Sequence, residues 1–370
     1  MSELTLVTGG NGFLALHIIQ QLLANDHPVR ATLRTLNKAD AVRQTLAATG
    51  VSIKHLSFVQ ADLINDSDWP QAMQGVTHVM SVAAPVFVNG ETTTDEMNQT
   101  AKTGTLRILK AAKVAGVKRV VMTANFGAVG FSNHSTQSTT EADWTDPNEP
   151  GLSDYERSKL LAERAAWDFA RQEHLDFATV AAGAMLGKPL DGHVSGSFGL
   201  VNQLLDGSSN FIPDIEFVIS NVEDVANAHV RALFTPAASG QRFLATNGAI
   251  TLPQIADLIR NQRPKLATKL PRRILPAWVI RLAAPFNAQA RNGKLFLSIN
   301  HHPSTQNAQQ RLGWQAKHSV TETIWQLLML YKAMHSHLPQ PFQFAMLISR
   351  SIHICRRAGI TSISFRLNRI

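Results

Sequence analysis

Residues 4–15 read LTLVTGGNGFLA, an apolar, β-branched run that leads directly into a glycine-rich turn. Gly9 would let the chain turn sharply out of the strand, and Gly12 would let the backbone approach a pyrophosphate without a Cβ in the way. Residues 13–26 carry apolar side chains at helical spacing, so a helix N-terminus would offer free N–H groups to the anion. A structural strand–helix corner can use the same glycines, but a strand before the turn and a helix after it favour a dinucleotide-binding turn.

The first 180 residues alternate short β-branched runs with longer helical patterns, the order expected of a parallel sheet with helices on both faces. We expect strands at 4–8, 28–33, 56–60, 77–83, 118–123 and 177–182. Helical periodicity lies at 13–26, 38–48, 95–115 and 153–172. The sequence therefore predicts an α/β fold with a doubly wound parallel Rossmann sheet and a smaller C-terminal mixed α/β substrate domain. We place the NAD(P)-binding Rossmann domain at 1–180 with contributions from 215–250, the substrate-binding region at 181–334, and a basic extension at 335–370.

The composition is that of a globular chain: 44% of the 370 residues are hydrophobic and 17% are charged. The net charge is +8, but five of these charges are arginines in 335–370, where no acidic residue occurs. Because the rest is only mildly basic on average, we expect no nucleic-acid partner. We expect the extension to be poorly ordered. Its arginines are interleaved with Ile, Leu and Phe, so an amphipathic surface-binding segment is the alternative.

No stretch has the length and apolar character of a membrane span, and the N-terminal sequence MSELTLVTGG lacks the features of a secretory signal. Cys355 is the single cysteine, so no internal disulfide is expected, and no Cys/His spacing indicates a metal site. We therefore expect a cytoplasmic protein without a metal. These features do not indicate the oligomeric state, for which monomer and homodimer both stay open.

The end of the second expected strand bears on the choice of dinucleotide. An Asp or Glu about twenty residues after the glycine turn would hydrogen-bond a ribose 2′-hydroxyl, but none is present. Arg30 and Arg34 flank the strand end, with Lys38 shortly after, and a guanidinium suits a 2′-phosphate by charge and forked geometry. We therefore predict NADP, with NAD as the alternative, and assign the phosphate first to Arg34. A solvated surface arginine is the other interpretation.

Asp62 and Leu63 follow the third expected strand. The Asp62 carboxylate would accept from an adenine amino group while Leu63 packs on the ring. From spacing alone, a helix N-cap or turn role for Asp62 is almost as well supported.

Tyr155 and Lys159 lie four residues apart at the start of an amphipathic helix, so they share one face. A phenol with a pKa of about 10 is a poor acid or base at neutral pH, and a neighbouring ammonium favours its phenolate form. Such pairs also occur often by chance. The spacing alone therefore does not identify an active site.

Taken together, these motifs resemble the extended short-chain dehydrogenases/reductases (the NAD-dependent epimerase/dehydratase family), and most of all their dihydroflavonol-reductase-like branch, which includes microbial aldehyde and ketone reductases. The resemblance covers residues 3–334. It rests on seven blocks in the family's order: TGGNGFLA (8–15), VRATLR (29–34), ADL (61–63), VAAP (82–85), RVVMT (119–123), YERSK (155–159) and VEDVANAH (222–229).

The resemblance implies that Tyr155 protonates the carbonyl oxygen as hydride arrives, and that Lys159 holds the nicotinamide ribose and lowers the Tyr155 pKa. It also implies cofactor contacts by Gly9, Gly12, Phe13 and Leu14 at the pyrophosphate, Arg34 at the 2′-phosphate, Asp62 and Leu63 at the adenine, and Ala83 and Pro85 along the fourth strand. The remaining assignments are substrate contacts by Phe87 and Phe126, for which ordinary packing is the alternative, and structural support between the domains by Asp224 and His229.

Two sites depart from the family pattern. Asn125 stands where relatives have the catalytic serine of a T-S-S sequence, and its amide N–H would still donate to a carbonyl oxygen. Thr123 is the less favoured substitute, and low or altered activity is the alternative. Ala181 and Ala182 replace the usual Asn-Pro, which affects the details of nicotinamide binding more than the reaction.

These observations predict an NAD(P)-dependent oxidoreductase that reduces a small aldehyde or ketone with NADPH, with Tyr155 as proton donor. A nucleotide-sugar epimerase or dehydratase is less favoured, because such relatives usually carry an acidic residue after the second strand. The third hypothesis is a catalytically weak NAD(P)-binding sensor protein.

Overall fold

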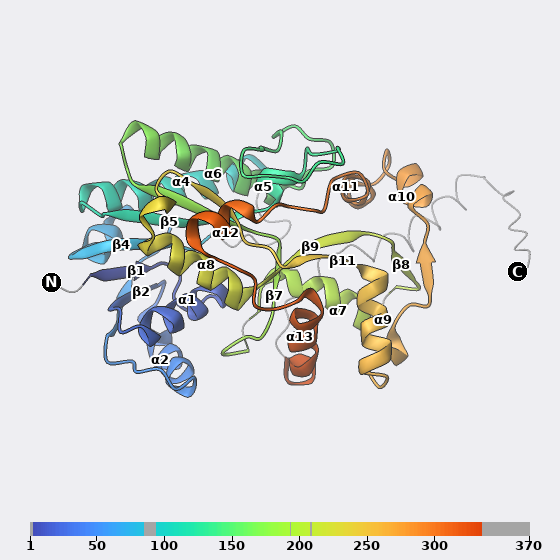
Figure 1. Ribbon diagram of the computed structural model, residues 1–370, viewed down its shortest axis with the longest axis horizontal. Helices are drawn as coiled ribbons and strands as arrows, with labels where there is room; N and C mark the ends of the chain where they lie inside the picture. The colour runs from blue at the N-terminus through green and yellow to red at the C-terminus, as the bar shows by residue number, and fades with distance from the viewer. Residues whose placement is uncertain (1–2, 85–93, 193, 208, 335–370) are drawn as a thin grey trace, which may run out of the picture.

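A seven-stranded parallel sheet forms the centre of the protein (Figure 1). The computed structural model describes residues 3–84, 94–192, 194–207 and 209–334. The strand order is β10-β6-β5-β4-β1-β2-β3, and each neighbouring pair is parallel. This order runs outward in both directions from β1 and β4, which confirms the doubly wound fold. The strands are β1 (Leu4–Val7), β2 (Val29–Leu33), β3 (Leu56–Gln60), β4 (Val76–Ser81), β5 (Arg119–Asn125), β6 (Phe177–Ala182) and β10 (Arg242–Leu244).

Helices cover both faces of this sheet, because successive side chains of a strand point to opposite sides. Val7 and Met80 point into the core beneath one helical layer, whereas Leu6 and Val79 belong to the core beneath the other. The first layer contains α1 (Phe13–Ala24), α2 (Ala39–Ala48) and α8 (Val222–Phe234). The second contains α3 (Trp69–Ala72), α4 (Thr94–Val114) and α6 (Asp154–Gln172).

The rest of the chain forms a smaller mixed α/β region. Its strands β7 (Ala184–Leu186), β9 (Glu216–Asn221) and β11 (Gly248–Thr251) form one sheet, and β8 (Phe211–Pro213) and β12 (Arg273–Leu275) form another. β9 pairs antiparallel with β11 and parallel with β7. The remaining helices are α5 (Gly127–Gly130), α7 (Gly199–Leu205), α9 (Leu252–Gln262), α10 (Ala277–Ala283), α11 (Ala288–Phe296), α12 (Gln306–Leu312) and α13 (Val320–Met334).

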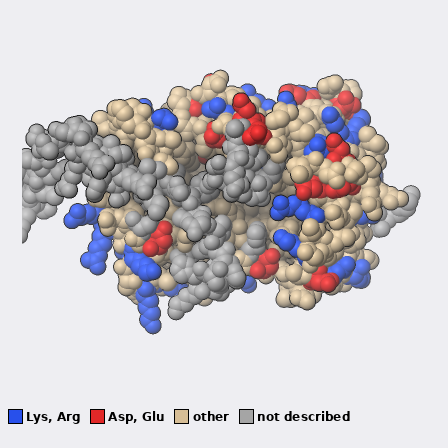
Figure 2. All heavy atoms as spheres, turned by 180° about the vertical axis from the view of Figure 1, so that it is seen from behind, with Lys and Arg blue, Asp and Glu red and all other residues tan. Residues whose placement is uncertain are grey.

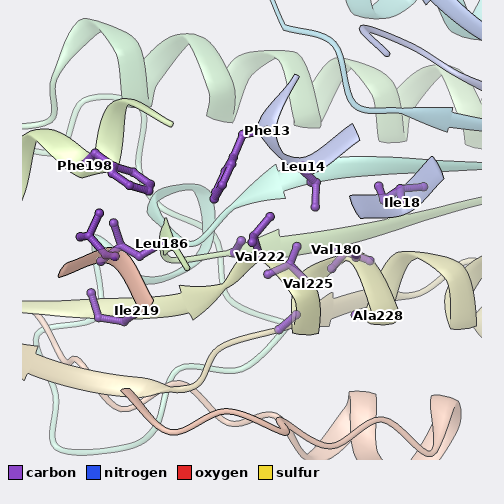
Figure 3. Close-up of a cluster of buried hydrophobic side chains, with 14 of the residues drawn as sticks. Phe13, Leu14, Ile18, Val180, Leu186, Phe198, Ile219, Val222, Val225 and Ala228 are labelled. Carbon is purple, nitrogen blue, oxygen red and sulfur yellow. The ribbon is translucent and has the colours of Figure 1, made fainter. Parts of the chain in front are cut away.

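One hydrophobic core joins the two regions (Figure 3). Phe13 of α1 packs edge-on against Phe198, which directly precedes α7, with 5.7 Å between ring centroids. Around them converge side chains from both regions: Leu14, Ile18, Val180, Leu186, Ile219, Val222, Val225 and Ala228. The predicted domain boundary at residue 180 therefore remains a prediction, because this core contains residues from both sides of it.

The six expected strands correspond to β1 through β6, but the seventh strand was not predicted. β10 has only three residues and pairs with β6. Arg242 in β10 extends from the sheet toward α6, where its Nε lies 3.1 Å from Glu163 Oε1. Its guanidinium also lies over the Trp144 ring, 3.6 Å from the centroid. These contacts attach the short strand to α6 and to the segment around Trp144.

Within the described part of the chain, no helix is both long enough and apolar enough to cross a membrane. Those same residues contain no group of three or more His, Cys, Asp or Glu side chains placed to hold a metal ion. The predicted basic extension, 335–370, lies outside the described residues.

Candidate active site

The glycine turn joins β1 to α1 in the manner that the sequence predicts. Gly9 has φ +68°, a left-handed conformation that side chains disfavour. A Cβ built at Gly10 would lie 2.6 Å from the Cβ of Ala31 on β2, so the turn needs glycine there as well, which the sequence analysis missed. Gly12 is the N-cap of α1 and supplies no side-chain cap. The first N–H groups of α1 are therefore left for another acceptor.

Thr8 fastens the end of β1 to the end of β4. Its buried hydroxyl oxygen accepts hydrogen bonds from the backbone N–H groups of Val82 and Ala83, both at 2.9 Å. The hydroxyl donates to Met80 O at 3.3 Å. Ala83 is thereby held beside the glycine turn, where a Cβ at Gly9 would lie 3.2 Å from the Ala83 Cβ. Pro85, predicted to contact the cofactor, and Phe87, predicted to contact the substrate, lie outside the described residues.

The three basic residues near the end of β2 have different environments. Arg30 donates to the backbone oxygens of Ala72 and Gln74, at 3.0 and 2.6 Å, so its guanidinium has a structural role. Arg34 comes directly after β2 and is exposed, as is Lys38. The structure thus leaves Arg34 accessible at the position where the sequence places the 2′-phosphate.

Asp62 and Leu63 lie just after β3. The Asp62 carboxylate accepts from the backbone N–H of Ile64 at 3.2 Å, which is the turn role that spacing left open. Leu63 is half-buried against α4, where a Cβ built at Gly104 would lie 3.4 Å from the Leu63 Cβ. Contacts of both residues with adenine remain a prediction.

Tyr155 and Lys159 lie on the first turns of α6, whose start is fixed by a capping box. Ser153 Oγ accepts from the N–H of Glu156 at 3.2 Å, and Glu156 Oε2 accepts from the N–H of Ser153 at 3.0 Å. Lys159 Nζ lies 5.6 Å from the centroid of the Tyr155 ring. Tyr155 is 44% exposed as a whole residue, so a ligand can reach it although protein atoms crowd the phenol.

The electrostatics of this pair differ in part from expectation. Burial lowers the pKa of the Lys159 ammonium to about 8. Loss of surrounding water raises the pKa of Tyr155 above its ordinary value, and the nearby Glu156 carboxylate raises it further. Desolvation dominates the pKa of Tyr155 in the chain alone, and Lys159 is not among the groups that shift it. The phenol stays protonated at neutral pH, as a proton donor requires.

Asn125 is the last residue of β5, and its amide has a fixed orientation. Its Oδ1 accepts from the backbone N–H of Gly127 at 2.6 Å. Because an N–H needs an acceptor, this contact assigns the oxygen and turns the Nδ2 amide hydrogens elsewhere. Nδ2 has no hydrogen-bond partner among the described residues. Asn125 therefore holds a donor available at the position of the family's serine.

The Thr123 hydroxyl is already hydrogen-bonded to a buried histidine. His229 Nδ1 lies 2.8 Å from Val225 O, so this nitrogen carries the proton and Nε2 is an acceptor. The Thr123 hydroxyl donates to that Nε2 at 2.9 Å. Burial lowers the pKa of His229 to about 4, which keeps the ring neutral. Asn125, and not Thr123, is thus the available donor at the end of β5.

Phe126 has the surroundings of a core residue. Its side chain is 3% exposed and packs edge-on against Phe131, with 5.9 Å between ring centroids. A Cβ built at Gly130 would lie 2.4 Å from the Phe126 ring. Packing accounts for this residue, and its contact with a substrate remains a prediction.

Asp224, interpreted from the sequence as a support, is buried at the start of α8 and holds the segment before α13. Its carboxylate accepts from the N–H groups of Lys317 and His318, both at 3.1 Å. It also accepts from Asn247 Nδ2 at 2.6 Å, and its backbone oxygen accepts from the Trp314 indole at 2.9 Å. One carboxylate thus connects segments from three parts of the chain.

Comparison with known proteins identifies relatives across most of the chain. The model of the 3-beta hydroxysteroid dehydrogenase/isomerase family matches residues 6–182. Tetraketide alpha-pyrone reductase 2 of Arabidopsis thaliana is 30% identical over 271 residues, covering 71% of this chain and 84% of the relative. Ketoreductase azaE of Aspergillus niger is 30% identical over 297 residues, covering 73% and 86%.

Solved structures share the fold at lower identity. Yeast methylglyoxal/isovaleraldehyde reductase Gre2, crystallised with NADPH, superposes with a TM-score of 0.73 at 22% identity, covering 90% of this chain and all of that one. The solved structures show the shared fold, and the sequence relatives at 30% identity also show the family. The chain belongs to the extended short-chain dehydrogenases/reductases, in the dihydroflavonol-reductase-like branch, and is an NAD(P)-dependent oxidoreductase.

Proposed function

We propose that the protein reduces a small aldehyde or ketone with NADPH, with Tyr155 as proton donor and Asn125 as hydrogen-bond donor to the carbonyl oxygen. The convergence of the predicted site on one sheet edge carries the proposal. Gly9 follows β1, Arg34 follows β2, Ala83 follows β4, and Asn125 ends β5. Since these strands are parallel, their carboxyl ends meet at the same edge, where open α/β sheets bind their ligands.

The residues at this edge fit a dinucleotide phosphate. The first N–H groups of α1 have no side-chain cap and follow a turn that Gly9 and Gly10 keep free of side chains. Such a helix N-terminus favours an anion through its N–H groups and its dipole. Arg34 adds an exposed positive charge after β2. Gre2 structures from yeast and Candida albicans that share this fold contain NADPH, which supports the choice of cofactor.

The chain's own groups supply orientation and the proton. When bound, NADPH supplies the hydride that forms the new C–H bond at the carbonyl carbon. The Asn125 Nδ2 amide donates to the carbonyl oxygen and stabilises the negative charge that develops there. The Tyr155 hydroxyl gives its proton to that oxygen, so the products are an alcohol and the oxidised cofactor. The Lys159 ammonium stabilises the phenolate until a proton from water restores the phenol.

Replacing Arg34 with alanine tests the cofactor preference. We expect the KM for NADPH to rise about 10- to 100-fold, the value of charge-assisted hydrogen bonds to a phosphate, with little change in the KM for NADH. Steady-state kinetics with both cofactors measures this. Lys54→Ala, which removes an exposed charge just before β3, at the amino end of that strand, is the matched control. Equal losses with both cofactors would contradict a contact between Arg34 and the 2′-phosphate.

Asn125 offers a sharp test of the proposed chemistry. Asn125→Asp keeps an oxygen for the Gly127 N–H but replaces the amide donor with an acceptor, so kcat is expected to fall about 10²- to 10³-fold. Asn125→Ser restores the family's hydroxyl donor and is expected to preserve or raise kcat. NADPH oxidation with a panel of aldehydes and ketones measures both. NADPH binding without turnover of any carbonyl would instead favour a sensor protein.

A further inference from the structure

Charge is distributed very unevenly along the chain. Residues 258–321 contain eleven Lys and Arg and no Asp or Glu, whereas residues 1–257 contain 18 Lys and Arg against 26 Asp and Glu. The net charges of the two stretches are therefore +11 and −8. The mildly basic average of the chain before residue 335 hides this contrast. A single-sign stretch of this size creates a strong local potential.

The basic stretch includes α9, α10 and β12, which lie at the end of the molecule remote from the N-terminus (Figure 1). Basic side chains project from this end in the opposite view (Figure 2). Its exposed cations around β12 and α10 are Lys265, Lys269, Arg272, Arg273 and Arg281.

Exposed apolar side chains gather in the same place. Four large apolar residues occur at four-residue intervals along β12, α10 and the turn that follows: Ile274, Trp278, Leu282 and Phe286. Leu282 is 67% exposed and Phe286 is 91% exposed. Isolated exposed apolar residues are normal, but a cluster bordered by charges marks an interaction site. We call these four residues, with the five exposed cations, the α10 surface.

A hollow borders the α10 surface. It has a volume of about 300 Å³ and is lined by Arg260, Pro264, Ala267, Thr268, Leu270 and Arg272. Arg260 already pairs with Asp257 at 2.7 Å, whereas Arg272 is exposed. The hollow thus combines cationic, hydroxyl and apolar groups beside the protruding side chains, a composition suited to a phosphate headgroup.

Charge argues against two occupants from the chain itself. The extension 335–370 carries five arginines and no acid, so the α10 surface would repel it. Two copies meeting through this surface would bring the same positive charges together. The acidic stretch of another copy has the right sign, but its exposed large apolar residues among those described, such as Leu36, Ile64 and Val114, lie far apart in sequence and belong to different segments.

We propose that the α10 surface binds the anionic surface of a phospholipid bilayer, a function beyond carbonyl reduction. Trp278, Leu282 and Phe286 would enter the boundary between headgroups and acyl chains, as the apolar face of an interfacial helix does. The surrounding Lys and Arg would be attracted to anionic headgroups.

Co-sedimentation of the full chain with vesicles tests this proposal. We expect binding to vesicles of phosphatidylcholine mixed with phosphatidylserine, weak binding to phosphatidylcholine alone, and a decrease at high salt. Leu282→Ser/Phe286→Ser and Arg272→Gln/Arg273→Gln are each expected to lower the partition coefficient at least about tenfold. NADPH oxidation and the melting temperature of each variant verify that it is folded.

Matched substitutions elsewhere distinguish this surface from general stickiness. Leu36→Ser/Val114→Ser removes two other exposed apolar side chains, and Lys102→Gln/Lys110→Gln removes two exposed charges of α4. Both are expected to bind vesicles like the unchanged protein. The proposal is overturned if phosphatidylserine does not increase vesicle binding. That result would favour an acidic protein as the partner of this surface. The proposal is also overturned if the α10-surface variants bind normally, which would assign binding to 335–370 alone.

Discussion

Tyr155→Phe is expected to lower kcat for carbonyl reduction about 10²- to 10⁴-fold, the contribution of a positioned general acid. The substitution removes only the hydroxyl, and the ring remains on the first turn of α6 beside Lys159. Because the pKa of Tyr155 is raised, the phenol of the unsubstituted protein is protonated at neutral pH. The variant therefore loses a proton donor that every molecule of the unsubstituted protein carries. Single-turnover oxidation of NADPH in the presence of an aldehyde measures the effect.

The control for this prediction is Tyr331→Phe, which removes the hydroxyl of the chain's other tyrosine. We expect it to leave kcat unchanged. NADPH affinity, followed by the fluorescence of the bound cofactor, should be similar in Tyr155→Phe and in the unchanged protein. Full activity of Tyr155→Phe would remove Tyr155 from the chemistry while leaving the cofactor site intact.

Asp224→Ala is expected to lower the free energy of unfolding by about 3–5 kcal/mol, since it leaves several buried donors without their charged acceptor. The N–H groups of Lys317 and His318 and the amide of Asn247 all lose the carboxylate. Asn247 Oδ1 in turn accepts from the N–H of Asn221 at 2.7 Å, so the start of α8 loosens as well. Denaturant unfolding measures the change.

Glu223→Ala is the matched control, because Glu223 precedes Asp224 on the same helix but its side chain is 38% exposed. It is expected to change the free energy of unfolding by less than about 0.5 kcal/mol. Asp224→Asn keeps one acceptor oxygen and should fall between the two. Similar stability of Asp224→Ala and Glu223→Ala would show that water replaces the buried carboxylate.

Local patterns predicted most of the central sheet and of its covering helices, but no individual element of residues 183–334. The glycine turn, the six longer strands and the intervening helices have strong periodicity and turn chemistry, which depend on neighbours in sequence. The Tyr155–Lys159 pair was assigned through the family resemblance, because its position on one helix face did not by itself identify an active site. The seventh strand, β10, was not predicted because three residues show no periodicity. Only its pairing with β6 defines it as a strand.

Roles set by long-range contacts were not readable from the sequence. Arg30 and Arg34 both flank the end of one strand, but only the Arg30 guanidinium donates to the backbone oxygens of Ala72 and Gln74, which the sequence does not reveal. The orientation of the Asn125 amide depends on the Gly127 N–H, and the burial of Phe126 depends on how α5 packs. The pKa of Tyr155 likewise depends on burial, which spacing does not report.

The position of β10 at the sheet edge has a consequence for how the protein is made. Its partner β6 ends at Ala182, and about sixty residues of the smaller region must be synthesised before Arg242 emerges. Until then β6 is an unpaired edge, and an edge of this kind invites pairing with other chains. Closing so long a loop is also slow in folding. A fragment that stops at the end of β6 would therefore be prone to aggregate. The nucleotide-binding half would complete its folding only together with the smaller region.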